Sequence, residues 1–215
     1  MNLELVKELS LLNGTSGNEE RVREYILSKL PPECETAVDA LGNLIVTKKG
    51  AKTPKNKVML CAHMDEVGFI ATMINDDGSI KFAPVGGINA SAVFGRKVRS
   101  ESGVMGVIAA KATHLVKDDE KEKQPEISAL SIDIGASSAE EAEKSVRQGE
   151  CFYFESKFFD FGENMLKGKA LDDRVGCAVL IGLLNSPLPC DLTCVFTVQE
   201  EIGTRGAQCA AYSVK

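Results

Sequence analysis

A histidine and an aspartate stand at the end of a short apolar run, in the segment Cys61-Ala62-His63-Met64-Asp65-Glu66. Alternate residues of a β-strand point to the same face, so extended chain would place His63 and Asp65 on one face, about 7 Å apart. A carboxylate that holds one imidazole nitrogen leaves the other free to bind a metal ion. Ligands gather at the carboxyl ends of strands in open α/β sheets, where this segment would lie. The alternative is a hydrogen-bonded histidine at a polar strand end.

Two adjacent aspartates, Asp172 and Asp173, precede a second apolar run. Negative charge is favourable at the start of a helix, because the free N–H groups point towards it. Ordinary helix capping therefore explains the pair when it is taken alone. Alternatively, one of the two carboxylates faces away from solvent and bridges two cations.

Two adjacent glutamates, Glu200 and Glu201, stand just beyond the apolar run Leu192–Val198, after Gln199. Neighbouring residues point in different directions, so one glutamate could bind a metal ion while the other faces a substrate water. A solvated pair in a loop is the alternative, and it is less usual at the exit of so apolar a strand.

Helical and strand patterns alternate around these three segments, which is typical of an α/β fold. Residues 1–30 show two amphipathic helical patterns that end at Asn13-Gly14 and at Pro31-Pro32. The apolar runs Val58–Ala62 and Leu192–Val198 predict strands buried on both faces, as in the centre of an α/β sheet. Further expected elements are a strand at Leu44–Thr47, a helix at Val175–Leu184 and a helix within Gly203–Tyr212.

The middle of the chain has a different pattern, with closely spaced β-hairpins. Asp76-Asp77-Gly78 and Glu101-Ser102-Gly103 are turn signals between alternating apolar runs. Such spacing predicts a small β-barrel or sandwich. We therefore expect a discontinuous α/β domain, residues 1–66 and 166–215, interrupted by a β-rich insertion at 67–165.

The composition excludes several functional classes. The chain of 215 residues has 25 Lys and Arg against 31 Asp and Glu, a net charge of −6, which argues against nucleic-acid binding. No apolar stretch approaches the roughly 20 residues of a membrane span, and charged residues interrupt the N-terminus where a secretory signal would be apolar. The seven cysteines are odd in number and scattered, which fits a reducing cytoplasm.

Taken together, the segments Ala62–Gly68, Lys169–Arg174 and Val198–Gly203 resemble the tetrahedral (TET) aminopeptidases, also called glutamyl or deblocking aminopeptidases. The resemblance runs from about Leu3 to the last residue. It implies a three-layer αβα catalytic domain of the zinc-peptidase kind, interrupted by a β-barrel-like dimerisation domain. The family forms homo-oligomers, from dimers to hollow tetrahedral dodecamers.

The resemblance also assigns roles to individual residues. His63 and Glu201 would each bind one metal ion, and Asp172, rather than Asp173, would bridge two. Glu200 would be the general base, and Asp65 would orient His63. The implied reaction is hydrolysis of the N-terminal residue of a peptide by a water held between two divalent ions, zinc or cobalt.

One departure from the family pattern affects the expected activity. The family uses two further ligands, an Asp after the strand that carries Glu201 and a His near the C-terminus, and both are absent up to Lys215. His114, the only other histidine, is expected to be structural or at a subunit contact. We therefore expect this chain to be inactive alone. The alternative to an aminopeptidase is a non-catalytic, truncated or degenerate relative that acts only as an assembly subunit. Glycoside hydrolysis is disfavoured, because adjacent carboxylates seldom span the roughly 5–9.5 Å that it requires.

Overall fold

The chain forms two compact units, each with its own hydrophobic core. The computed structural model describes residues 2–110 and 126–214. One unit comprises Met1–Glu66 and Lys157–Lys215, and the other comprises Val67–Ser156. The first unit resumes at Lys157, ahead of the expected boundary at residue 166, because Phe158 packs against its core.

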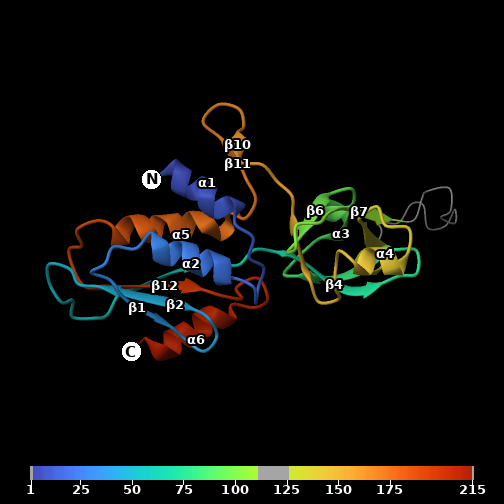
Figure 1. Ribbon diagram of the computed structural model, residues 1–215. Coiled ribbons are helices and arrows are strands. Elements are labelled where there is room, and N and C mark those ends of the chain that lie inside the picture. Colours follow the sequence, from blue (N-terminus) through green and yellow to red (C-terminus); the bar gives the residue numbers. More distant parts are fainter. Residues whose placement is uncertain (1, 111–125, 215) are drawn as a thin grey trace. The chain divides into compact units, whose positions relative to one another are not determined.

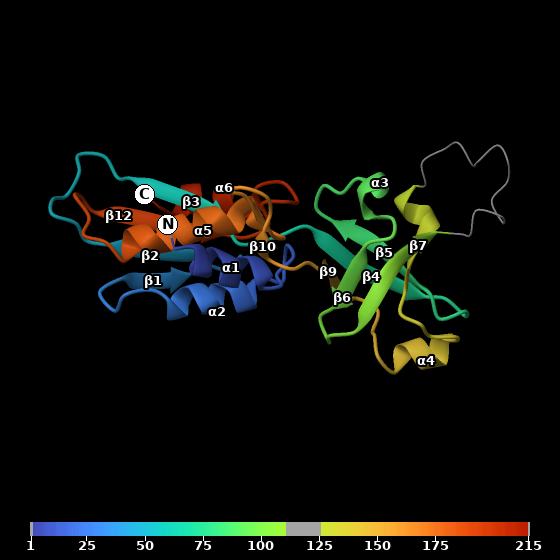
Figure 2. The ribbon, with the colours of Figure 1, turned by 90° about the horizontal axis from the view of Figure 1, so that it is seen from above.

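The first unit is built on a four-stranded sheet in the order β1-β2-β12-β3. β2 pairs antiparallel with β1 and β12, whereas β12 and β3 run parallel, and Figure 2 shows the four strands side by side. The strands are β1 (Glu35–Val38), β2 (Leu44–Lys48), β3 (Met59–His63) and β12 (Leu192–Thr197).

Helices cover both faces of this sheet. α1 (Leu3–Leu11), α2 (Glu20–Ser28) and α5 (Leu171–Leu184) lie over one face, and α6 (Arg205–Ser213) lies over the other, as Figure 1 shows. α1 begins where the Asn2 side chain accepts hydrogen bonds from the backbone N–H groups of Glu4 and Leu5. Leu9 of α1, Ile26 of α2, Leu44 of β2 and Phe196 of β12 are fully buried between the layers. The expected αβα catalytic fold is confirmed.

β3 differs from its prediction. It lies at the edge of the sheet, and in the described part of the chain β12 is its one neighbour. Val58 and Leu60 therefore keep 40% and 36% of their surface exposed. The expectation that Val58–Ala62 is buried on both faces is wrong. In an edge strand, the side chains on each face lack the neighbouring side chains that a second adjoining strand would supply. β12, with strands on both sides, has the buried pattern that was predicted.

The second unit is a closed barrel in the order β4-β5-β8-β7-β6-β9, as the hairpin signals predicted. The fully buried Phe69 lies at its centre, edge-on to Phe82 at 5.0 Å and to Phe154 at 5.1 Å between ring centroids. Its elements are β4 (Gly68–Ile74), β5 (Ile80–Val85), α3 (Ala90–Val93), β6 (Lys97–Ser100), β7 (Met105–Ala110), the 3₁₀ helix η2 (Ile127–Ala129), β8 (Leu130–Asp133), α4 (Ala139–Glu143) and β9 (Cys151–Phe154).

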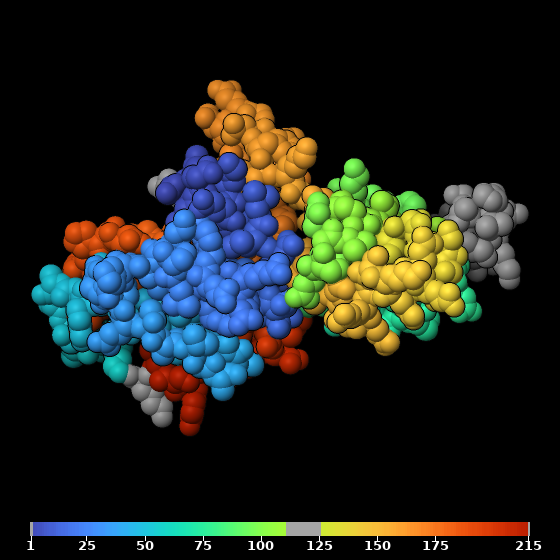
Figure 3. Space-filling view, viewed as in Figure 1, coloured from blue at the N-terminus to red at the C-terminus, as the bar shows by residue number. Residues whose placement is uncertain are grey.

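A short hairpin completes the α/β unit. β10 (Phe159–Asp160) and β11 (Leu166–Lys167) pair antiparallel, and the hairpin projects from the surface beside α1 (Figure 3). The chain continues from it through Gly168 into α5. Among the described helices, none has the length and apolar content that crossing a membrane requires.

Candidate metal centre

The parallel pairing of β3 and β12 brings two of the candidate segments together. His63 is the last residue of β3 and lies opposite Thr197, the last residue of β12. The chain after β12 turns at once into Glu200 and Glu201. The carboxyl ends of two parallel strands therefore deliver an imidazole and two carboxylates to one edge of the sheet, the usual place for a site in an α/β fold.

The third segment approaches the same imidazole from α5. Asp172 Oδ1 lies 3.0 Å from His63 Nε2, and Glu200 Oε2 lies 3.9 Å from the same nitrogen. Among the described residues, His63, Glu200 and Glu201 offer ligand atoms that all lie within 4.8 Å of one another. The structure thus brings His63 together with three of the candidate carboxylates, those of Asp172, Glu200 and Glu201.

The two adjacent aspartates have different surroundings. Asp173 Oδ1 accepts a hydrogen bond from the backbone N–H of Gly176 at 2.9 Å, which is the helix-capping role considered for the pair. The side chain of Asp172 is 89% exposed and faces His63 instead. Both residues have non-helical dihedral angles, so the regular helix begins after them. Helix capping and approach to the histidine are therefore both present, on different residues.

Asp65 does more than was predicted for it. His63 Nδ1 lies 3.1 Å from the main-chain oxygen of Asp65 and 3.5 Å from its carboxylate, so the imidazole is held mainly by the backbone. The carboxylate accepts hydrogen bonds from the backbone N–H groups of Glu200 and Glu201, at 3.0 and 3.1 Å, and from the Ser16 hydroxyl at 2.6 Å. Asp65 therefore fixes the turn that carries the two glutamates.

Glu19 is a site residue that sequence reasoning missed. Its buried carboxylate accepts hydrogen bonds from the backbone N–H groups of Gly17 at 2.8 Å and Gln199 at 3.1 Å. Gln199 has a φ of +54°, a left-handed conformation that is uncommon for a residue other than glycine. The Glu19 contact thus supports a strained residue immediately before Glu200. In the sequence, Glu19 looks like any acidic residue at a helix start.

Burial and charge set the protonation of these groups. Burial lowers the pKa of His63, but Asp65, Asp172 and Glu200 outweigh it and raise that pKa to about 9. Burial raises the pKa of Glu201, and the nearby His63 only partly offsets this. For Asp65, burial is opposed by the hydrogen bonds of His63, Ser16 and the two N–H groups, which lower its pKa below the ordinary value. The imidazolium therefore supplies positive charge among the carboxylates.

We expect His63 of the metal-free protein to titrate near pH 9 when its ring protons are followed by NMR. The folded state holds this proton more tightly than the unfolded state, so the associated stabilisation is fully present below pH 6.5 and is lost as the pH rises through about 9. Asp172→Asn should lower the pKa, because it removes one of the carboxylates that raise it. A His63 that titrates near 6.5 in the parent protein would contradict this arrangement.

The donor set fits a divalent transition metal. Zinc binds imidazole nitrogen and carboxylate oxygen, and two such atoms bound to one tetrahedral ion at about 2.1 Å are about 3.4 Å apart. The separation of 3.0 Å from His63 Nε2 to Asp172 Oδ1 is close to that value. Nδ1 is held by the backbone, which leaves Nε2 facing the carboxylates. His114, the other histidine of the sequence, lies outside the described residues.

Comparisons with known proteins point to one family. Residues 42–215 match the family described as M42 glutamyl aminopeptidase. The glutamyl aminopeptidase of Lactococcus lactis is 34% identical over 94% of this chain, which covers 61% of that protein. The solved TET aminopeptidase of a marine sediment Thaumarchaeota archaeon superposes with a TM-score of 0.91 at 36% identity, over 99% of this chain and 62% of that one.

A second solved structure is similar in the same way. The TET1 peptidase of Pyrococcus horikoshii, which can assemble into a tetrahedron or a large octahedral shell, gives a TM-score of 0.86 at 35% identity, over 97% of this chain and 64% of that one. The chain thus spans less than two thirds of the length of each of these relatives.

Proposed function

Because the chain belongs to the M42 glutamyl aminopeptidase family, we propose that it carries much of the active site of a metal-dependent aminopeptidase, which hydrolyses N-terminal residues from peptides. The observation that carries the proposal is the meeting of His63, Asp172, Glu200 and Glu201 at the carboxyl ends of β3 and β12. His63, Asp172 and Glu201 offer the imidazole and carboxylate donors that such a metal ion requires.

His63, Asp172 and Glu201 would hold the metal, with Asp172 between two divalent ions, zinc or cobalt. The metal supplies Lewis-acid activation of the water and of the peptide carbonyl when it is bound. Asp172 suits the bridging role because its side chain is 89% exposed and its Oδ1 lies 3.0 Å from His63 Nε2, which leaves Oδ2 for a second ion. Glu201 is held in the cluster by the contact of its backbone N–H with Asp65.

Glu200 would accept a proton from the attacking water and return it to the leaving amine. Its carboxylate is 37% exposed, so it can face a substrate, and its backbone is fixed through Asp65. Asp65 is then a positioning residue for both glutamates and for His63. Its lowered pKa keeps it ionised, so that it remains an acceptor for the two N–H groups.

Removal of the metal tests the proposal in the protein extended to the full length of its relatives. Dialysis against a chelator should abolish the hydrolysis of aminoacyl-p-nitroanilides, and Zn²⁺ or Co²⁺ should restore it. N-acetylated versions of the same substrates are the control and should not be cleaved, because an aminopeptidase needs the free amine. Full activity in the metal-free protein, or equal cleavage of the acetylated substrates, would contradict the proposal.

We further propose that the barrel unit mediates homo-oligomer assembly. The likeness to a shell-forming peptidase supports this, and so do the exposed apolar residues Met73, Phe94, Met105 and Val107 on the barrel. Residues 67–156, which have their own closed core, should self-associate in analytical ultracentrifugation. A monomer at high concentration would contradict this role.

We also propose a reducing cytoplasmic location, because all seven cysteines are free thiols.

A further inference from the structure

Three buried charged residues, Glu66, Lys169 and Arg174, join the segments that carry the proposed ligands. Glu66 follows His63 in the chain, whereas Lys169 and Arg174 stand on either side of Asp172. The side chains of Lys169 and Glu66 are only 8% and 4% exposed, and that of Arg174 is fully buried. Buried charges are costly unless they are paired, so their contacts show what holds this region together.

The Lys169–Glu66 ion pair spans the two ligand-bearing segments directly. Lys169 Nζ lies 2.6 Å from Glu66 Oε1, and it also donates to the main-chain oxygen of Leu12 at 3.0 Å. The same Glu66 oxygen accepts a hydrogen bond from the backbone N–H of Gly14 at 3.1 Å. The pair thus connects the end of β3 with the chain before Asp172, through a loop that leads out of α1.

Arg174 makes the same connection on the other side of Asp172. Its Nε donates to the main-chain oxygen of Met64 at 2.7 Å, next to His63. Its NH1 donates to the main-chain oxygens of Leu9 and Leu12, at 2.6 and 3.1 Å. Asp172 is therefore flanked in sequence by two cationic side chains. Each of them contacts both the segment that follows His63 and the main chain at the end of α1.

We propose that the Lys169–Glu66 ion pair is a positioning device for the metal centre, which holds the segments of His63 and Asp172 at the separation that a shared cation needs. The proposal rests on the metal-dependent function proposed above. The separation of 3.0 Å between His63 Nε2 and Asp172 Oδ1 joins two segments more than a hundred residues apart in sequence, so contacts between those segments must set it. Arg174 ties the start of α5 to the main chain beside His63 and to the end of α1. The ion pair then holds the loop before Asp172 against the end of β3.

The sign of the effect separates positioning from simple electrostatics. A lysine near a cation site repels the cation, so removal of its charge alone should strengthen metal binding. Loss of a positioning contact should weaken it, typically by about 10- to 100-fold. Lys169→Met removes the charge and the contact together while it preserves the aliphatic volume. A weaker affinity in this variant therefore identifies the positioning role.

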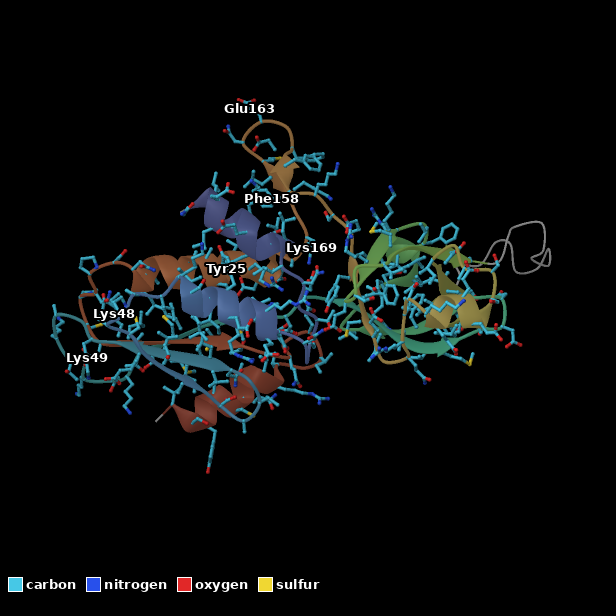
Figure 4. The ribbon with its side chains drawn as sticks, viewed as in Figure 1. Tyr25, Lys48, Lys49, Phe158, Glu163 and Lys169 are labelled. Atoms are coloured by element: carbon cyan, nitrogen blue, oxygen red, sulfur yellow. The ribbon has the colours of Figure 1, made fainter. Side chains whose placement is uncertain are left out.

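Lys48 offers a matched control in the same unit. Its buried ammonium group lies 3.0 Å from Glu33 and donates to the main-chain oxygens of Leu184 and Ser186, at 2.6 and 3.2 Å. Figure 4 shows Lys48 and Lys169 at opposite ends of the α/β unit. Lys48→Met thus removes a comparable buried lysine from the fold and leaves the proposed metal centre intact.

The experiment is calorimetric titration of the 215-residue chain with Co²⁺, with the binding that persists in His63→Ala subtracted. Lys169→Met should lower the Co²⁺ affinity by about 10- to 100-fold, whereas Lys48→Met should leave it within about twofold of the parent. Thermal unfolding of both variants shows how far each one destabilises the fold. An unchanged or stronger affinity in Lys169→Met overturns the positioning role, and so does an equal loss in Lys48→Met.

Glu66→Gln tests the partner without loss of shape. If the two residues act as a pair, the double variant Lys169→Met with Glu66→Gln should bind Co²⁺ no more weakly than the weaker single variant. Effects that simply add would overturn the pairing. A parent chain that binds no Co²⁺ at His63 would overturn the proposed metal function itself, whereas normal parent binding with unaffected variants would overturn only the positioning device.

Discussion

Glu200→Gln should lower kcat by about 10²- to 10⁴-fold in the full-length protein and leave the metal content unchanged, because it removes a proton acceptor and no proposed ligand. The amide keeps the size of the carboxylate but cannot take a proton from water at neutral pH. The contact of the Glu200 backbone N–H with Asp65 does not involve the side chain, so the turn should keep its shape. KM should change far less than kcat.

Glu201→Gln is the matched comparison, since it makes the same chemical change one residue further along. Its side chain is a proposed ligand, so this variant should lose metal, measured by elemental analysis after gel filtration. The two adjacent substitutions should therefore have different effects. Glu200→Gln should keep the metal and lose turnover, whereas Glu201→Gln should lose the metal. Normal turnover in Glu200→Gln, or metal loss equal to that in Glu201→Gln, would contradict the assignment of Glu200 as the base.

The α/β fold could be predicted from short-range patterns, whereas the grouping of the site residues followed from the resemblance of three segments to one family. One apolar strand run ends at His63 and another ends shortly before Glu200, and parallel strands in an α/β sheet present their carboxyl ends at one edge. Residue types and strand ends indicated a ligand site at His63, and the family resemblance joined Asp172 and the glutamates to it. The position of β3 at the edge of the sheet could not be predicted, because apolar content does not reveal how many neighbours a strand has.

The supporting contacts were missed because they depend on backbone groups far apart in the sequence. Asp65 accepts from N–H groups at positions 200 and 201, and Glu19 accepts from that of Gln199. A backbone N–H is the same at every position, so no residue pattern identifies the one that a carboxylate will reach. The Lys169–Glu66 pair is similar: each residue is an ordinary charge in the sequence, and only the fold shows that both are buried.

Arg174→Met should lower the free energy of unfolding of the α/β unit by about 3–5 kcal/mol, the usual effect of breaking a buried charged network by removing one partner. The fully buried guanidinium donates to the main-chain oxygens of Met64, Leu9 and Leu12, which would lose these donors in the interior. Glu66 would also lose a cation 3.9 Å away, although Lys169 would remain. The burial that lowers the pKa of Arg174 shows the same cost of enclosing its charge.

The two units can unfold separately, so the measurement needs a probe in each one. Amide hydrogen exchange of β12 reports on the α/β unit, and exchange of β7 reports on the barrel. Arg174→Met should accelerate exchange in β12 and leave β7 unchanged. Arg99→Met is the control: Arg99 pairs with Glu155 on the barrel surface, where solvent screens the charges, so it should change neither. Parent-like exchange in β12 of Arg174→Met would mean that other groups satisfy the three carbonyls. Arg174 would then not be the residue that holds the two ligand-bearing segments together.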